Sequence, residues 1–313
     1  MKNASLLIHP EELSYKWINR LAESKIPTLA IHPVGSLKAN ESLENLISLL
    51  DEKTFREKID YAKSKGLKIE YELHAARYLL PADLFQDHPE WFRMNAEGER
   101  TPDLNFCPSN SDALEYLSES AARLIKKLYG TTSRYFLWLD DAKDSACHCS
   151  KCKGLSPSDQ QMIAMNKIIK RLKKEDRKAE LAYLAYMSTI DPPKTIKPHK
   201  DIFLEYAPID REFDKPISAS AQSDPISKLL SLFGMEKAKV LDYWYDNSLF
   251  SNWKKPPKKF NLNKEVLRAD IDYYRSLGFE DISSFACFLG EDYEELFGDV
   301  DISDFGTLLF GRN

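Results

Sequence analysis

Residues 135–141 read YFLWLDD, a row of five large apolar side chains that ends on the carboxylates Asp140 and Asp141. A short run rich in aromatic and aliphatic residues predicts a buried strand. Two carboxylates directly after this strand predict a polar site at its carboxyl end.

Similar β-rich apolar runs lie on both sides of this strand, and stretches with the 3.6-residue apolar period of a helix separate them. This alternation predicts a parallel sheet with crossover helices, and about eight such units are the number that closes a (β/α)8 barrel. The other expected strands are 5–9, 28–31, 67–72, 180–186, 202–206, 240–245 and 282–289. The expected helices are 13–21, 43–65, 112–129, 159–174, 226–233 and 264–277.

No linker or change of composition divides these units. We therefore predict an α/β fold with a single TIM-barrel-like domain over residues 1–313, with long βα loops and a short C-terminal extension from about residue 290. The alternative is an open doubly wound sheet. The chain has no GxGxxG after its first strand and no GxxxxGK[ST], which disfavours that alternative and predicts no nucleotide cofactor.

Composition excludes some partners. A formal net charge of −5, with lysines scattered among acidic residues, disfavours nucleic-acid binding. The N-terminal apolar run is too short for a signal peptide, and no segment approaches the ~20 apolar residues of a membrane span. These features predict a cytoplasmic protein without a membrane partner, whose oligomeric state the sequence leaves open.

Polar and aromatic side chains gather at the expected strand ends, where barrels of this kind carry their functional groups. Carboxylates bind sugar hydroxyls, and flat rings cover the apolar faces of a sugar, so this mixture predicts a carbohydrate ligand. The alternative is that the rings are ordinary core residues and the histidines are hydrogen-bonded within the core. The expected substrate-binding residues are His9, His32, Glu72, His74, Trp138, Tyr186, Tyr206, Tyr243, Tyr245 and Asp246.

Asp140 and Asp141 are the leading candidates for acid–base chemistry, and Glu205 is a third. Adjacent carboxylates repel each other, which favours the protonated form of one of them, as a general acid requires. The ionised partner would orient an acetamido group of the substrate that acts as internal nucleophile. The alternative is that one aspartate caps the next turn while the other is solvated.

Three cysteines, Cys147, Cys149 and Cys152, lie within six residues, and Cys107 belongs to the preceding long loop. This spacing lets three thiolates reach one tetrahedral ion, with Cys107 as the expected fourth ligand. The pattern predicts a closed structural zinc site that holds the loop beside Asp141. Free buried thiols are the alternative.

Several motifs in combination resemble an uncharacterised bacterial family of glycoside-hydrolase-like barrels, over nearly the whole chain. The motifs are IHPVG at 31–35, HPEWFRM at 88–94, NFCPSN at 105–110, LWLDD at 137–141, CHCSKC at 147–152, EYAP at 205–208 and YWYDNS at 243–248. That family is similar to endo-β-N-acetylglucosaminidases and, more distantly, to hexosaminidases and α-glucuronidases, which implies a carbohydrate substrate.

The resemblance also implies roles for the aspartate pair. In the hexosaminidase-like relatives the fourth strand ends in Asp-Glu, an orienting residue followed by the general acid. This chain has Asp140-Asp141 at that place, with a shorter second side chain, so Glu72, Glu205 and Asp246 are alternative acids.

We therefore expect a glycoside hydrolase-like protein that cleaves a small oligosaccharide, such as an N-acetylhexosaminide, with Asp141 as proton donor and Asp140 as orienting carboxylate. The alternative function is a non-catalytic carbohydrate-binding barrel that has lost its acid. A metal- or redox-sensing role of the cysteines is a third hypothesis.

Overall fold

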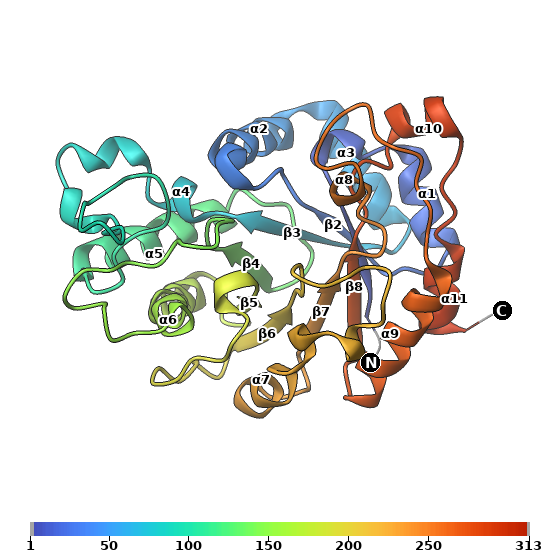
Figure 1. The fold of residues 1–313 in the computed structure, drawn as a ribbon. Coiled ribbons are helices and arrows are strands. Elements are labelled where there is room, and N and C mark those ends of the chain that lie inside the picture. Colours follow the sequence, from blue (N-terminus) through green and yellow to red (C-terminus); the bar gives the residue numbers. More distant parts are fainter. Residues whose placement is uncertain (1–2, 312–313) are drawn as a thin grey trace.

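The computed structural model of the chain describes residues 3–311. Its eight strands are all parallel and pair in sequence order into a closed barrel, because β8 pairs with β1 (Figure 1). The predicted (β/α)8 barrel is thereby confirmed. The strands are β1 (Ser5–Ile8), β2 (Thr28–Ile31), β3 (Lys68–His74), β4 (Arg134–Trp138), β5 (Glu180–Ala185), β6 (Ile202–Tyr206), β7 (Lys239–Asp242) and β8 (Asp281–Phe285).

Helices surround the barrel and connect its strands (Figure 1). The expected helix 43–65 is two helices, because Glu52 has an extended backbone with ψ of 134° that interrupts the helical hydrogen bonds. The α-helices are α1 (Tyr15–Glu23), α2 (Ala39–Asp51), α3 (Lys53–Ser64), α4 (Ala76–Leu79), α5 (Ser111–Ile125), α6 (Pro157–Glu175), α7 (Ile226–Phe233), α8 (Asn247–Phe250), α9 (Lys264–Ser276), α10 (Glu291–Phe297) and α11 (Ser303–Phe310).

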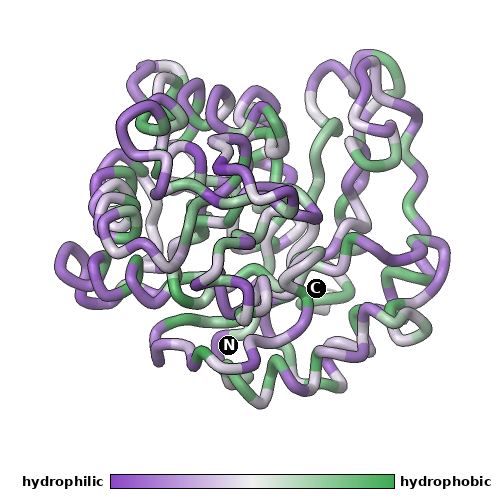
Figure 2. The backbone as a smooth tube through the Cα atoms, turned by 60° about the vertical axis from the view of Figure 1, so that its left-hand side comes forward, coloured by the Kyte–Doolittle hydropathy of each residue, from purple (hydrophilic) through white to green (hydrophobic). Residues whose placement is uncertain are grey.

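Local sequence explains where the main helices begin. The side chains of Ser14, Asn110, Ser156 and Asn263 accept hydrogen bonds from backbone N–H groups in the first turns of α1, α5, α6 and α9. The outer helices change between hydrophilic and hydrophobic along the chain (Figure 2), as expected when one face of each helix packs on the barrel.

The core has two layers, because successive residues of a strand point to opposite faces of the barrel wall. The outer layer lies between strands and helices and includes Leu6, Leu29, Leu181 and Val240. The inner layer fills the upper part of the barrel with Leu7, Ala30, Phe136, Trp138, Ala182, Phe203, Leu241, Tyr243, Phe285 and Cys287. The carboxyl ends of the strands lie above this inner layer, and we call this end of the barrel the mouth.

Within residues 3–311, no helix combines the length and apolar character needed to cross a membrane.

Candidate functional site

Three histidines follow one another around the mouth, at the ends of β1, β2 and β3. Nδ1 of His9 lies 2.8 Å from the carbonyl oxygen of His32, and Nδ1 of His32 lies 2.8 Å from that of Glu72. Nδ1 of His74 lies 2.6 Å from the carbonyl oxygen of Leu139. Each ring is therefore attached to the backbone of the next strand.

This arrangement fixes the tautomer of the three rings. A carbonyl oxygen only accepts hydrogen bonds, so Nδ1 of each ring carries the proton, and Nε2 of the neutral ring is an acceptor. Burial, together with the charges of His74 and His9, holds the pKa of His32 well below its ordinary value. His32 is therefore neutral, and its ring offers an acceptor to a hydroxyl group.

Trp138 forms the floor beneath these histidines. Its ring centroid lies 5.4 Å from that of His32 and 5.1 Å from that of His74. The Tyr243 ring stacks on Phe285 across the mouth, with centroids 5.1 Å apart. The mouth thus combines flat apolar surfaces with hydrogen-bonding groups.

Asp141 is half-buried at the mouth. Its Oδ1 accepts a hydrogen bond of 2.8 Å from the hydroxyl of Tyr186, which is also half-buried. A Cβ atom on Gly35 would lie 3.6 Å from Oδ2 of Asp141 and 2.7 Å from the ring of His74. Gly35, Asp141 and His74 therefore border the same space.

Asp140 is buried and has different partners from Asp141. Its Oδ2 accepts a hydrogen bond of 2.6 Å from the backbone N–H of Asn105 and lies 3.5 Å from Nε of Arg77. Its own N–H donates to Oδ1 of Asn105 over 2.9 Å. Asp140 is thus fastened to the long loop 80–110.

The pKa of Asp140 is raised chiefly by burial, against the opposing effects of Asn105 and Arg77. The sequence suggested mutual repulsion of the two aspartates as the cause, and the structure corrects this explanation. The physical reason is that neighbouring residues point in different directions at the end of β4, so the two carboxylates have separate surroundings.

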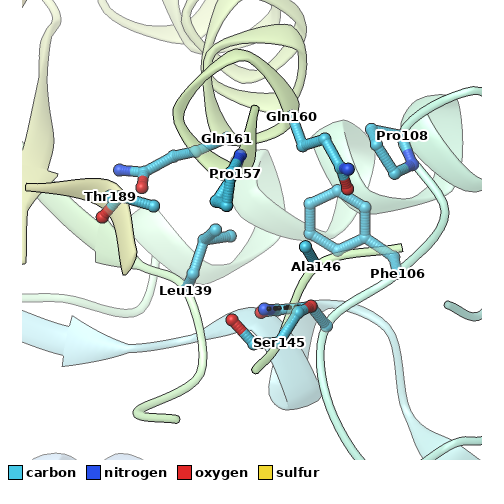
Figure 3. A pocket seen from close by; sticks show the side chains of 10 residues that line it. Phe106, Pro108, Leu139, Ser145, Ala146, Pro157, Gln160, Gln161 and Thr189 are labelled. Atoms are coloured by element: carbon cyan, nitrogen blue, oxygen red, sulfur yellow. Dashed lines mark hydrogen bonds between the residues drawn. The ribbon is translucent and has the colours of Figure 1, made fainter. Parts of the chain in front are cut away.

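A small cavity lies behind this strand end (Figure 3). It has a volume of about 20 Å³, room for about one water molecule, and Leu139, Phe106, Ser145 and Gln160 line it. Asn105 also borders the cavity and donates a hydrogen bond of 3.2 Å from Nδ2 to the carbonyl oxygen of Ser145. The cavity is too small to hold a sugar.

Asp246 is buried at the start of α8, next to the end of β7. Its Oδ1 accepts hydrogen bonds from the backbone N–H of Ser248 and of Leu249, over 3.1 and 3.3 Å. Burial raises the pKa of Asp246, while these bonds and the charge of His9 oppose the rise. Asp246 therefore caps a short helix while it contributes to the electrostatics of the mouth.

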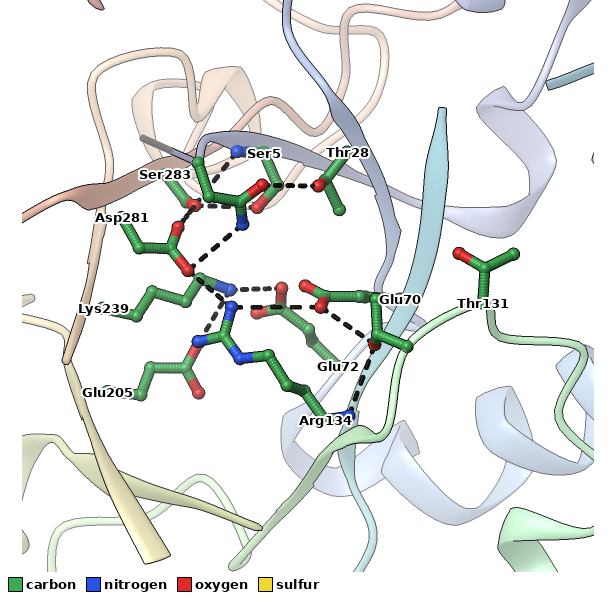
Figure 4. Close-up of polar contacts among 12 residues, drawn as sticks. Ser5, Thr28, Glu70, Glu72, Thr131, Arg134, Glu205, Lys239, Asp281 and Ser283 are labelled. Atoms are coloured by element: carbon green, nitrogen blue, oxygen red, sulfur yellow. Dashed lines mark hydrogen bonds and ion pairs between the residues drawn. The ribbon is translucent and has the colours of Figure 1, made fainter. Parts of the chain in front are cut away.

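Glu72 and Glu205 do not lie at the mouth, in contrast to the sequence expectation. Both pair with Nζ of Lys239, and the three side chains have no exposed surface (Figure 4). Glu205 also accepts a hydrogen bond of 2.7 Å from Nε1 of Trp138. Glu72 stands two residues before His74, which lies at the mouth. Every second residue of a strand points into the barrel, so Glu72 lies one layer deeper than His74. Glu205 lies at a similar depth, because it pairs with the same lysine.

Tyr206 and Tyr245 also lie away from the mouth. Tyr206 is buried in the outer layer, and its hydroxyl donates to the carbonyl oxygen of Gln222 over 2.6 Å. Tyr245 packs between the rings of Phe260 and Phe305, with centroids 5.7 and 5.8 Å away. Tyr206 points outward because successive side chains of a strand face opposite sides, and its neighbour Glu205 points into the barrel.

The four cysteines form one buried group, which we call the cysteine cluster (Cys107, Cys147, Cys149 and Cys152). Their sulfur atoms all lie within 4.8 Å of one another, and this group could hold a metal ion. The sulfur of Cys107 lies 3.7 Å from that of Cys149 and 4.0 Å from that of Cys152. The loops that carry these cysteines lie beside α5 and α6 (Figure 1).

In a second close group, His9, Glu12 and Cys287, the carboxylate of Glu12 and Nδ1 of His9 are already hydrogen-bonded within the protein. Both carboxylate oxygens of Glu12 accept backbone N–H groups, from His9 over 2.9 Å and from Leu289 over 3.0 Å. Nδ1 of His9 donates to His32. We therefore interpret this group as a structural connection between β1 and the loop after β8.

Sequence reasoning missed the roles of Asn105, Arg77, Gly35 and Lys239. Asn105 and Gly35 belong to recognisable motifs, NFCPSN and IHPVG, and that membership was an available signal. Nothing in the sequence around Lys239 distinguishes it from the many exposed lysines, because only barrel closure buries it.

The closed barrel of eight parallel strands with surrounding helices defines a (β/α)8 fold. The chain belongs to the family described as Domain of unknown function (DUF4838), which matches residues 44–286. A comparison with curated proteins finds no match.

Solved glycoside hydrolases share this fold. The chain is similar to a β-galactosidase from Rahnella sp. R3, with 13% identity and a TM-score of 0.55 over 91% of this chain and 50% of that chain. It is also similar to a catalytic mutant of Gan42B, a GH42 β-galactosidase from G. stearothermophilus, with 14% identity and a TM-score of 0.56 over 99% of this chain and 55% of that chain. A third similar structure contains GH20 catalytic modules of the pneumococcal exo-β-D-N-acetylglucosaminidase StrH, with 12% identity and a TM-score of 0.50 over 99% of this chain and 82% of that chain.

At these identities the likeness shows the fold alone. The chain spans about half the length of the two β-galactosidases. The expected relation to glycoside-hydrolase barrels is confirmed for the fold, and the narrower relation to endo-β-N-acetylglucosaminidases and α-glucuronidases stays a prediction.

Proposed function

We propose that this protein binds a small oligosaccharide at the mouth and hydrolyses a glycosidic bond, with N-acetylhexosaminides as the preferred substrate class. One observation carries the proposal. Asp141 is a half-buried carboxylate at a strand end, hydrogen-bonded to Tyr186 and close to Gly35 and His74. In this scheme Asp141 transfers a proton to the glycosidic oxygen.

The other mouth residues bind and orient the sugar. Nε2 of His9, His32 and His74 accepts hydrogen bonds from sugar hydroxyls, because Nδ1 of each ring is committed to a backbone carbonyl. The rings of Trp138 and Tyr243 are 1% and 3% exposed, so they support the polar mouth residues from below and present little surface of their own to a sugar. Asp140 acts as the orienting carboxylate by holding the end of β4 against loop 80–110.

Hydrolysis of a panel of aryl glycosides, including N-acetylhexosaminides and glucuronides, tests this proposal. Asp141→Asn keeps the size of the side chain and removes the transferable proton, so we expect kcat to fall by about 10²-fold or more. Tyr186→Phe, which removes the hydroxyl that orients Asp141, should cause a smaller fall.

Asp144→Asn is the matched control, because Asp144 is an exposed aspartate of the same loop whose side chain contacts His148. It should retain wild-type activity. No turnover of any glycoside, or full activity in Asp141→Asn, would contradict the proposed hydrolysis.

A second candidate function is sugar binding without hydrolysis. The burial of Glu72 and Glu205 inside the barrel favours this second function. Glycoside hydrolysis commonly needs two carboxyl groups beside the scissile bond, and the two glutamates cannot supply them from the interior. Calorimetric titration with N-acetylglucosamine oligosaccharides separates the two functions. Binding without product formation by the wild-type protein supports this candidate.

We further propose that the cysteine cluster holds Zn²⁺ as a closed structural site. Four thiolates ~2.3 Å from a tetrahedral zinc ion lie about 3.8 Å from one another, close to the separations of Cys107 from Cys149 and Cys152. Elemental analysis should find stoichiometric zinc in the wild type. Cys149→Ser should lose most of the zinc, whereas Cys287→Ser is the control and should keep it, because Cys287 lies outside the cluster. Zinc-free wild-type protein would contradict the proposal.

A further inference from the structure

Asn105 connects Asp140 with the loop that carries Cys147. Its backbone N–H and its Oδ1 both bind Asp140, over 2.6 and 2.9 Å. Its Nδ2 donates to the carbonyl oxygen of Ser145 over 3.2 Å. One buried amide side chain therefore joins the end of β4 to two loops that are distant in sequence.

Both loops are anchored by cysteines immediately after these contacts. Asn105 stands two residues before Cys107, and Ser145 stands two residues before Cys147. Neither segment forms a helix or strand. The sulfurs of Cys107 and Cys147 lie within 4.8 Å of each other, so a bound metal would hold both segments at one point.

Backbone hydrogen bonds also hold the two loops near the cluster. Asn105 has a φ of 41°, in the left-handed region that asparagine adopts more readily than most other non-glycine residues. The backbone N–H of Cys107 donates to the carbonyl oxygen of Trp91 over 2.8 Å, and Gln160 binds both the N–H and the carbonyl oxygen of Cys147, over 2.8 and 3.0 Å. The two loops also contact each other directly, because the N–H of His148 donates to the carbonyl oxygen of Met94 over 2.8 Å, and the cluster adds a second point at which they join.

We propose that Asn105 is a positioning residue through which metal in the cysteine cluster fixes the carboxylate of Asp140. The inference rests on the proposed zinc site, and it gives that site a regulatory role: loss of the metal releases Asn105 and changes the surroundings of Asp140. Hydrolysis need not occur for this coupling to exist.

The test follows the Asp140 carboxyl carbon by NMR in protein labelled with ¹³C at aspartate Cγ, with the signal assigned by its loss in Asp140→Asn. In the zinc-loaded wild type the backbone N–H of Asn105 stabilises the ionised form of Asp140, and the side-chain bonds of Asn105 to Asp140 N–H and to the Ser145 carbonyl oxygen hold that N–H in place. Asn105→Gly keeps the backbone N–H but removes both side-chain bonds. We therefore expect the titration midpoint of Asp140 to move to higher pH in Asn105→Gly, and also in wild type stripped of zinc by a chelator. Adding Zn²⁺ to the stripped protein should restore the original midpoint.

Asn105→Gly permits the positive φ and keeps all four cysteines, so its zinc content should equal that of the wild type. Asn110→Gly is the matched control, since Asn110 lies in the same loop but caps α5. It should destabilise the helix end without moving the Asp140 midpoint.

Two results would overturn the inference. One is a wild-type midpoint for Asp140 in Asn105→Gly. The other is a midpoint that moves in Asn105→Gly but not on zinc removal, because Asn105 would then act without the metal. The measurement uses no substrate, so absence of glycoside hydrolysis contradicts the proposed activity alone.

Discussion

The ring of His74 lies against the backbone of Gly35 at the edge of the mouth. A Cβ atom on Gly35 would lie only 2.7 Å from Cδ2 of His74. The ring cannot withdraw freely, because its Nδ1 donates to the carbonyl oxygen of Leu139. The absence of a side chain at Gly35 thus lets the His74 ring occupy this position beside Asp141.

Gly35→Ala should therefore displace His74 and weaken sugar binding about tenfold or more, with a loss of about 1–3 kcal/mol in the free energy of unfolding. Calorimetric titration and urea unfolding measure the two effects. Gly154→Ala is the control, because its Cβ would meet no atom within 4 Å. Equal affinities in Gly35→Ala and the wild type would contradict the role of this glycine.

The histidine tautomers are directly measurable. We expect the neutral rings of His9, His32 and His74 to show protonated Nδ1 and unprotonated Nε2 in ¹H–¹⁵N correlation spectra, because each Nδ1 donates to a carbonyl oxygen. His88, whose ring stacks on Trp91 at the surface, should show a mixture of tautomers. A protonated Nε2 in a neutral ring of the first three would refute the assignment.

Lys239 should be essential for stability. Lys239→Met leaves Glu72 and Glu205 buried without their cation, and we expect the free energy of unfolding in urea to fall by about 3–5 kcal/mol. Lys237→Met, which removes the partly exposed pair with Glu180, should cost about 1 kcal/mol or less. Similar losses of unfolding free energy in the two variants would show that the buried ion pairs of Lys239 contribute no more to stability than the partly exposed pair of Lys237.

Asp159 should make stability depend on acid pH. Burial opposes its ionisation, but hydrogen bonds from Ser156 and from the backbone N–H groups of Thr195 and Ile196 prevail and lower the pKa of Asp159 to about 2. An unfolded aspartate has a pKa of about 3.9, so the unfolded state binds more protons between these values, and this contribution to stability is lost as pH falls from about 4 to about 2.

Asp159→Asn should therefore lower the free energy of unfolding by about 2 kcal/mol at neutral pH, and its difference from the wild type should narrow as pH falls below about 4. Unfolding in urea at several pH values measures this difference. The exposed Asp60→Asn should change stability by less than about 0.5 kcal/mol. A pH-independent difference for Asp159→Asn would contradict the linkage.

The strands were predictable because each is a short apolar run between helical repeats, and 28–31 and 202–206 were expected with their observed bounds. The ends of β7 and β8 were not. Apolar residues continue past the ends of both strands, but the pairing of β7 with β8 ends where Asp242 lies opposite Ser284. A strand ends where its hydrogen-bond pairing ends, and hydropathy alone does not show that point.

The candidate site was predictable where a residue stands at a strand end and points inward. The structure places His9, His32, His74 and Tyr243 around the mouth for this reason. Glu72, Glu205, Tyr206 and Tyr245 also lie near strand ends, but their depth and direction depend on barrel closure. The cytoplasmic location, the bound zinc and the sugar stay predictions.

The sequence by itself determined the (β/α)8 barrel, the strand that ends in Asp140 and Asp141, and the grouping of cysteines, since periodicity and spacing are local properties of the chain. Only the tertiary structure decided that Lys239 pairs with Glu72 and Glu205 inside the barrel, and that Asn105 joins Asp140 to the loop that carries Cys147. These contacts join residues 34 to 167 positions apart. Their partners are set by how the barrel closes and its loops fold back, which no local pattern encodes.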